Sequence, residues 1–157
     1  MNNYAFIDSQ NLNLSVKGMG WKLDFAKFRI YLKDKYDITK AFLFIGYVPE
    51  FQSLYTDLQK YGYIIVFKPT LKLPNGKVKG NVDAEMVLTA VTEINNYDKC
   101  LIVSADGDFY CLIRYLVDKN KLLKLMIPDR NKYSSLLRKF SNYMVFMNDL
   151  RAKLEEK

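Results

Sequence analysis

The sequence predicts an α/β fold, a single three-layer sandwich around a mostly parallel central sheet. Short segments rich in β-branched and aromatic residues alternate with segments whose apolar residues recur at helical spacing. The strand-like segments are apolar almost throughout, as in strands buried on both faces. The chain has 157 residues, half of them apolar, which is the size and composition of one domain. We therefore expect one domain over residues 1–150, followed by a charged helix end or tail at 151–157.

The expected strands are short and connected by helical patterns, which places helices on both faces of the sheet. Asn11, Lys17 and Lys22 are expected to lie in a loop after the first strand. The strands are expected at residues 4–7, 41–48, 63–68, 100–104 and 122–127, with a further short strand at 143–147.

The expected helices begin and end at residues that favour helix termini. Asp24 can cap a helix whose apolar residues recur every three or four positions. Pro49 suits the first turn of the next helix, and Gly62 suits its end. The pair Asn75-Gly76 is a tight-turn signal, which favours a small hairpin. The remaining helices are expected at residues 83–94, 109–119 and 133–140, with a charged helix at the C-terminus.

The composition excludes several classes of site. The chain contains no histidine, which rules out Ser-His-Asp and Cys-His catalysis and His-ligated zinc. The net charge of +7 favours polyanionic partners such as nucleic acid. No apolar run approaches the roughly 18 to 20 residues of a membrane span, and the first residues lack a signal-peptide layout. Cys100 and Cys111 lie in apolar runs and are expected to be reduced core thiols, so we expect a cytoplasmic protein without a membrane partner.

Four aspartates are expected at the edge of the sheet where parallel strands end. Asp8 follows the first strand, Asp106 and Asp108 follow the strand at 100–104, and Asp83 opens the preceding helix. Two carboxylates about 4 Å apart repel by on the order of 4 kcal/mol at an effective dielectric near 20. A hard divalent cation such as Mg²⁺ or Mn²⁺ offsets this repulsion and can neutralise charge on a phosphate. The joint placement of the four acids therefore predicts a metal site.

Each of these aspartates also has a plainer explanation. Asp8 could be a loop acid that caps the following segment, and Asp83 could be only a helix N-cap. Asp106 and Asp108 could form a turn and cap the helix at 109, because aspartate favours caps and turns. Glu85 lies about 200° round a helix from Asp83, so a place on the helix surface suits it at least as well as a metal site.

Basic residues flank the acidic edge. The stretch 68–80 contains lysines and no acid, and it ends three residues before Asp83. Trp21 and Tyr133 are candidates for stacking on bases, although most aromatic side chains pack in the core. A second basic group consists of Arg130, Lys132, Arg138 and Lys139. The residues expected to contact RNA phosphates are Lys72, Lys77, Lys79 and Lys132.

Three ordered motifs carry a resemblance to a known family. They are FIDSQNLN at 6–13, KGNVDAE at 79–85 and LIVSADGDF at 101–109. Together they resemble the NYN domain, including its LabA-like bacterial members, within the PIN-like nuclease superfamily. The resemblance implies a PIN-like fold, a Mg²⁺ or Mn²⁺ site at the carboxyl edge of the sheet, and metal-dependent ribonuclease activity.

The resemblance also implies roles for individual residues. Asp8, Asp83 and Asp106 are similar to the metal-site carboxylates, and Asp108 is similar to a fourth acid, so these four are the expected catalytic and metal-binding residues. The supporting residues are Asn11, which matches the amide of the motif and would orient Asp8 or a phosphate, and Ser104, which matches its hydroxyl and would support the acidic loop.

The leading hypothesis is a metal-dependent ribonuclease that cleaves RNA, expected to be single-stranded; a homodimer is compatible with it. Ser9 and Ala105 stand where the family usually has glycine, which matters if the backbone there needs positive φ or a close approach to phosphate. The alternative is therefore a non-catalytic RNA-binding module that keeps the acidic pocket. A third reading is a phosphohydrolase or nucleotide-binding domain, but neither G-x-G-x-x-G nor G-x-x-x-x-G-K-S/T occurs.

Overall fold

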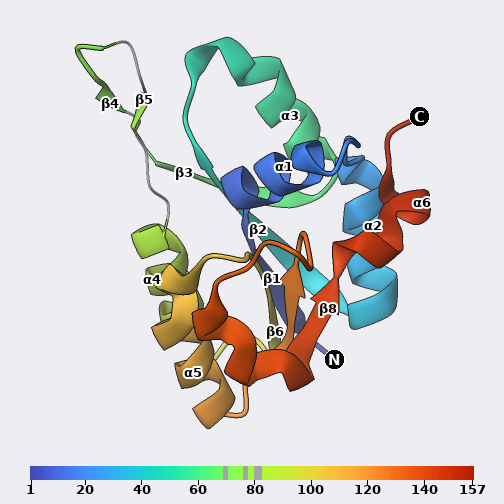
Figure 1. The fold of residues 1–157 in the computed structure, drawn as a ribbon, viewed down its shortest axis with the longest axis vertical. Coiled ribbons are helices and arrows are strands. Elements are labelled where there is room, and N and C mark those ends of the chain that lie inside the picture. Colours follow the sequence, from blue (N-terminus) through green and yellow to red (C-terminus); the bar gives the residue numbers. More distant parts are fainter. Residues whose placement is uncertain (69–70, 76–77, 80–82) are drawn as a thin grey trace.

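A six-stranded sheet forms the centre of the molecule, with helices on both faces (Figure 1). The computed structural model describes residues 1–68, 71–75, 78–79 and 83–157. Every neighbouring pair of strands in the sheet is parallel, in the order β3-β2-β1-β6-β7-β8. The predicted α/β sandwich is confirmed. The strands are β1 (Asn3–Asp8), β2 (Ile38–Gly46), β3 (Tyr63–Lys68), β6 (Cys100–Val103), β7 (Leu122–Ile127) and β8 (Met144–Phe146).

The helices fall between the strands. The prediction of a loop after the first strand is wrong, because Asp8 caps a helix there. The apolar pattern of this helix is weak and comes from Leu12 and Val16. The α-helices are α1 (Ser9–Gly18), α2 (Phe25–Tyr36), α3 (Gln52–Lys60), α4 (Asp83–Thr92), α5 (Tyr110–Asp118) and α6 (Arg151–Leu154). The 3₁₀ segments are η1 (Pro49–Phe51), η2 (Gly107–Phe109), η3 (Ser135–Tyr143) and η4 (Met147–Leu150).

The helix expected at residues 133–140 is present as η3, which is of the tighter 3₁₀ type. Its buried residues Leu137 and Phe140 are three positions apart, and this spacing matches the three-residue turn of a 3₁₀ helix. The helical backbone angles are interrupted at Phe140.

The two faces of the sheet carry separate hydrophobic cores. Along β1, Tyr4 and Phe6 belong to one core, and Ala5 and Ile7 belong to the other, because successive strand residues point to opposite faces. The first core includes side chains of α4, α5 and η3, and the second includes side chains of α1, α2, α3 and α6. These layers fix the carboxyl ends of β1 and β6 from both sides (Figure 1).

The predicted hairpin is present in the connection between β3 and α4. β4 (Leu71–Lys72) pairs antiparallel with β5 (Val78–Lys79). The hairpin of β4 and β5 projects away from the body of the molecule (Figure 1).

The strand order contains a point where the connections reverse direction. From β1 the chain proceeds through β2 to β3, whereas from β6 it proceeds through β7 to β8 on the other side. β1 and β6 are direct neighbours, with Ile7 opposite Val103 at their carboxyl ends. Such a switch point opens a crevice beyond the ends of the two strands, where sites in open α/β sheets form.

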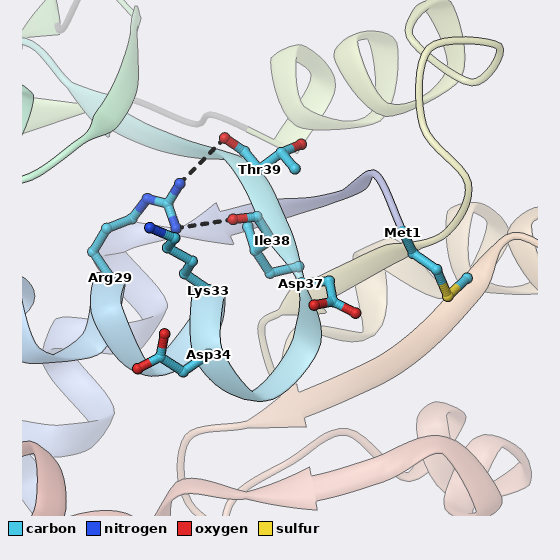
Figure 2. Close-up of a pocket in the computed structure, with 7 residues that line it drawn as sticks. All are labelled: Met1, Arg29, Lys33, Asp34, Asp37, Ile38 and Thr39. Atoms are coloured by element: carbon cyan, nitrogen blue, oxygen red, sulfur yellow. Dashed lines mark hydrogen bonds between the residues drawn. The ribbon is translucent and has the colours of Figure 1, made fainter.

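A depression of about 640 Å³ lies at the start of β2, away from the carboxyl ends of the strands (Figure 2). Its central side chain is Arg29, which donates hydrogen bonds to the carbonyls of Gly62, Ile38 and Thr39, each at 3.2 Å. The guanidinium therefore joins α2 to the starts of β2 and β3. The lining residues are Met1, Arg29, Lys33, Asp34, Asp37, Ile38 and Thr39.

The two cysteines differ in their environments. Both are free; Cys100 is buried, as expected, but Cys111 is exposed on α5, so the prediction of a core thiol is wrong for Cys111. Burial raises the pKa of the Cys100 thiol to about 12. At the C-terminus, Leu154 is buried and its carbonyl accepts from Asp24 N at 2.8 Å. Within the described ranges, the helices are too short or too polar to cross a membrane.

Candidate metal centre

Three of the four predicted aspartates meet at the switch point. Asp8, Asp83 and Asp106 each offer a carboxylate oxygen, and these oxygens all lie within 4.8 Å of one another. Asp8 ends β1, Asp106 follows β6, and Asp83 begins α4, which packs against β1. The sheet thus brings together side chains from three distant parts of the sequence.

Asp8 is fixed by hydrogen bonds to both of its oxygens. Asn11 N donates to Oδ1 at 3.2 Å, which caps α1, and Ser104 Oγ donates to Oδ2 at 3.1 Å. The plainer role of Asp8 as a helix cap is therefore real, and it leaves further lone pairs on both oxygens for a metal. Burial raises the pKa of the Asp8 carboxyl; the bonds from Asn11 and Ser104 lower it, and Asp106 raises it.

The loop after β6 is held by side chains on both sides. Ser104 Oγ accepts from Asp106 N at 3.1 Å, so it links the backbone of one carboxylate to the side chain of another. Asn11 Oδ1 accepts from Ala105 N at 3.0 Å. Asp106 Oδ1 accepts from Asp108 N at 2.9 Å and so caps η2. The expected supporting residues Asn11 and Ser104 both contact the acidic loop.

The electrostatics of the cluster suit a cation. The pKa of Asp83 is raised to about 6, first by burial and then by repulsion from Asp106, Asp8 and Asp108. In the part of the chain that the structure describes, neither Asp8 nor Asp106 forms a salt bridge. Three hard oxygen donors with mutual repulsion match the preferences of Mg²⁺ and Mn²⁺, so the residues present fit such an ion.

Replacing Asn11 with alanine is expected to lower the affinity for Mn²⁺ by roughly 10- to 100-fold, the usual effect of losing a partner that orients a ligand. The physical reason is that the Ala105 N–H loses its acceptor, so the loop that carries Asp106 is less well fixed. Titration calorimetry with Mn²⁺ measures the change. The matched control is Asn13→Ala on the exposed side of the same helix, which should bind Mn²⁺ like the wild type; equal affinities in all three proteins would contradict the role of Asn11.

Asp108 and Glu85 lie around the three-oxygen group. Asp108 is exposed in η2 and is close enough to Asp83 to raise its pKa, but its oxygens are not part of the group. Its role as a metal ligand stays a prediction. Glu85 is half-buried on α4 and is also outside the group.

The glycine that the acidic loop requires is Gly107. A Cβ there would lie 2.4 Å from Ser134 Oγ and 2.9 Å from Ser134 Cβ, so η3 packs directly on this position. By contrast, the described non-glycine residues with positive φ are Asp37 and Asn120. The backbone at Ser9 and Ala105 therefore does not need glycine for its conformation.

The expected nucleic-acid contacts are only partly described. Lys132 is exposed after β7. Lys77 lies outside the described residues, and only the backbone of Lys72 and Lys79 is described, in β4 and β5. Trp21 is 7% exposed and packs in the second core, so the prediction that it stacks on bases is wrong. The half-buried Tyr133 also packs against a core.

Lys139 of the second basic group lies beside two residues of α5, Tyr110 and Arg114, that were not singled out from the sequence. Tyr110 begins α5 directly after η2, and Lys139 donates to its hydroxyl at 2.9 Å. Arg114 lies one helical turn further along α5, also beside the Tyr110 ring. The signal in the sequence is the spacing of Tyr110 and Arg114 at i, i+4 immediately after the third motif.

Comparisons with known proteins agree with this geometry. The profile of the NYN domain family matches residues 4–148. The chain is 26% identical over 161 residues to the low amplitude and bright protein LabA of Synechococcus elongatus, covering 96% of this chain and 86% of that protein. A solved protein of unknown function from Vibrio parahaemolyticus has the same fold, with a TM-score of 0.80 and 19% identity, covering 99% of this chain and 96% of that one.

Proposed function

The chain belongs to the NYN domain family, as its three motifs predicted, and from this premise we propose that it is a metal-dependent ribonuclease acting on single-stranded RNA. The observation that carries the proposal is the group of three carboxylate oxygens within 4.8 Å of one another at the switch point of the sheet. NYN and PIN-like nucleases generally use divalent metals, and this chain retains the acids for one.

Asp8, Asp83 and Asp106 would hold Mg²⁺ or Mn²⁺, with Asp108 at the exposed rim. A bound ion of this kind supplies Lewis-acid polarisation of a phosphodiester and lowers the pKa of a water. Asp8 acts as the rigid ligand, because both of its oxygens are already oriented by hydrogen bonds. We assign to Asp108 the role of orienting the attacking water. Attack of the water oxygen at phosphorus would form a new P–O bond and break the bond to O3′, the proton lost by the water passing to O3′, so that the products carry a 5′-phosphate and a 3′-hydroxyl.

The basic residues would hold the RNA backbone. Phosphate contacts position the strand without reading its sequence, so lysines around an acidic centre suit a polymer better than a small ester. The proposed contacts are Lys72, Lys77, Lys79 and Lys132.

The proposal is tested with 5′-end-labelled single-stranded RNA incubated with the wild-type protein in Mn²⁺, in Mg²⁺ and in EDTA. Shorter labelled products are expected with a divalent metal and none with EDTA. Single-stranded DNA of the same sequence and an aryl phosphate serve as comparison substrates. Salt-sensitive RNA binding without product would favour the non-catalytic binding module, and hydrolysis of the aryl phosphate alone would favour a phosphatase.

A further inference from the structure

Two cations and a hydroxyl meet at one solvent-facing point on α5 and η3. Lys139 Nζ donates to Tyr110 Oη at 2.9 Å and lies 5.2 Å from the centroid of its ring. The guanidinium carbon of Arg114 lies 5.6 Å from the same centroid. Lys139 and Arg114 are exposed, and Tyr110 is half-buried. Because Lys139 is the donor, the hydroxyl proton of Tyr110 stays available to a further acceptor. These three residues form the cationic group.

The cationic group is carried by two elements that adjoin the loop of Asp106 and Asp108. Tyr110 follows Asp108 by two residues, so their Cα atoms are at most about 7 Å apart. Lys139 is carried by η3, whose start is fixed where Ser134 N donates to Ala105 O at 3.1 Å. Both elements that carry the cationic group are thus anchored to the loop that carries Asp106.

The charge of the cationic group is not balanced by an acid. Within the described part of the chain, neither Lys139 nor Arg114 forms a salt bridge. An anion with several acceptor oxygens could accept from the ammonium, the guanidinium and the Tyr110 hydroxyl together. Phosphate has this chemistry, and hydrogen bonds between charged partners are the stronger ones.

We propose that the cationic group binds a backbone phosphate of the RNA, next along the strand from the phosphodiester at the metal centre. This assignment rests on the proposed function and adds the direction in which the RNA strand would cross the protein. The β4–β5 hairpin precedes α4 and lies apart from α5 (Figure 1). The strand would therefore run from the hairpin, across the carboxylates, to α5 and η3.

The test measures RNA binding in an Asp106→Asn background in EDTA, where no cleavage interferes. The anisotropy of fluorescein-labelled single-stranded RNA is followed at several salt concentrations. When the double variant Lys139→Gln/Arg114→Gln is added to this background, the protein should bind RNA about tenfold more weakly. This is the effect expected from losing one charged hydrogen bond. The variant's slope of log K against log salt should fall by roughly 0.7, the value for one phosphate contact on a single strand.

The matched control is Lys33→Gln/Lys35→Gln, which removes the same charge from exposed positions near the end of α2, at the opposite edge of the sheet. It should change the affinity by less than about twofold and leave the slope unaltered. Melting temperatures of both double variants verify that they fold. Equal affinities and equal slopes for the two double variants would overturn the assignment.

Two further results separate the assignment from its alternatives. If the wild type gives no RNA product in Mn²⁺ but the difference in slope is found, the phosphate site stands and the ribonuclease proposal fails. The binding assay is repeated on RNA with and without a 5′-phosphate. An equal loss for both RNAs supports a backbone phosphate, whereas a loss confined to the phosphorylated RNA overturns that assignment in favour of a terminal phosphate.

Discussion

Replacing Asp106 with asparagine is expected to reduce metal-dependent RNA cleavage by roughly 10²- to 10³-fold without changing the fold, since single electrostatic groups in active sites typically contribute this much. Asp106 supplies one of the three carboxylate oxygens, and asparagine removes its negative charge. The amide oxygen of asparagine can still accept from Asp108 N, so η2 keeps its cap. The rate of product formation in Mn²⁺ is the measurement.

The control for this variant is Asp57→Asn, the same substitution at an exposed position on α3. It should cleave RNA at the wild-type rate. Circular dichroism of both variants checks that the fold is retained. Full activity of Asp106→Asn would show that the chemistry does not use the three-carboxylate group.

Asp83→Asn is expected to change stability in opposite directions with and without metal. In EDTA at pH 7.5 the variant should melt roughly 1–3 °C above the wild type, because one member of a repelling cluster is neutral; exposed charge pairs are typically worth 0.2–1 kcal/mol. Mn²⁺ at 100 times its Kd should raise the melting temperature of the wild type by roughly 5–10 °C. The variant should lose most of this rise, because it lacks one ligand.

The effect in EDTA should depend on pH with a defined sign. The pKa of Asp83 is about 6 in the folded protein, against an ordinary value of 3.8, so its charge destabilises the fold. This destabilisation is absent below pH 3.8 and complete above pH 6. The advantage of Asp83→Asn over the wild type should therefore shrink from pH 7.5 to pH 5. A difference in melting temperature that stays constant over this range would contradict the assignment of the raised pKa to Asp83.

The sequence was most informative where function depends on chain topology. Asp8 and Asp106 could be placed together because each follows a buried apolar segment, and parallel strands end at one edge. Asp83 could be placed as the start of a helix, and α4 does begin there. The sequence alone could not show which of the four aspartates would contribute to the three-oxygen group. Asp106 and Asp108 follow the same strand, and only the turn of η2 separates their positions.

Other features depend on contacts that no local pattern shows. The helix α1 was not predicted because its sequence is mostly polar. Only a narrow apolar side of the helix, with Leu12 and Val16, packs against the core. Trp21, which the sequence left available for RNA, is buried in the same core as Leu12 and Val16. Gly107 is needed because of Ser134, a residue of a different element, and this packing cannot be read from the motif around Gly107.

The switch point also determines when the proposed metal centre can assemble during synthesis of the chain. The hydrogen bond from Ser104 to Asp8 joins residues 96 positions apart, and β1 has to pair with β6 before the carboxylates meet. The entropy cost of closing a loop of that length is met before the contact can stabilise the fold, so this pairing is expected late in folding. A nascent or partly folded chain would expose basic residues to cellular RNA but would lack an assembled centre. Cleavage would thus be confined to molecules whose sheet is complete.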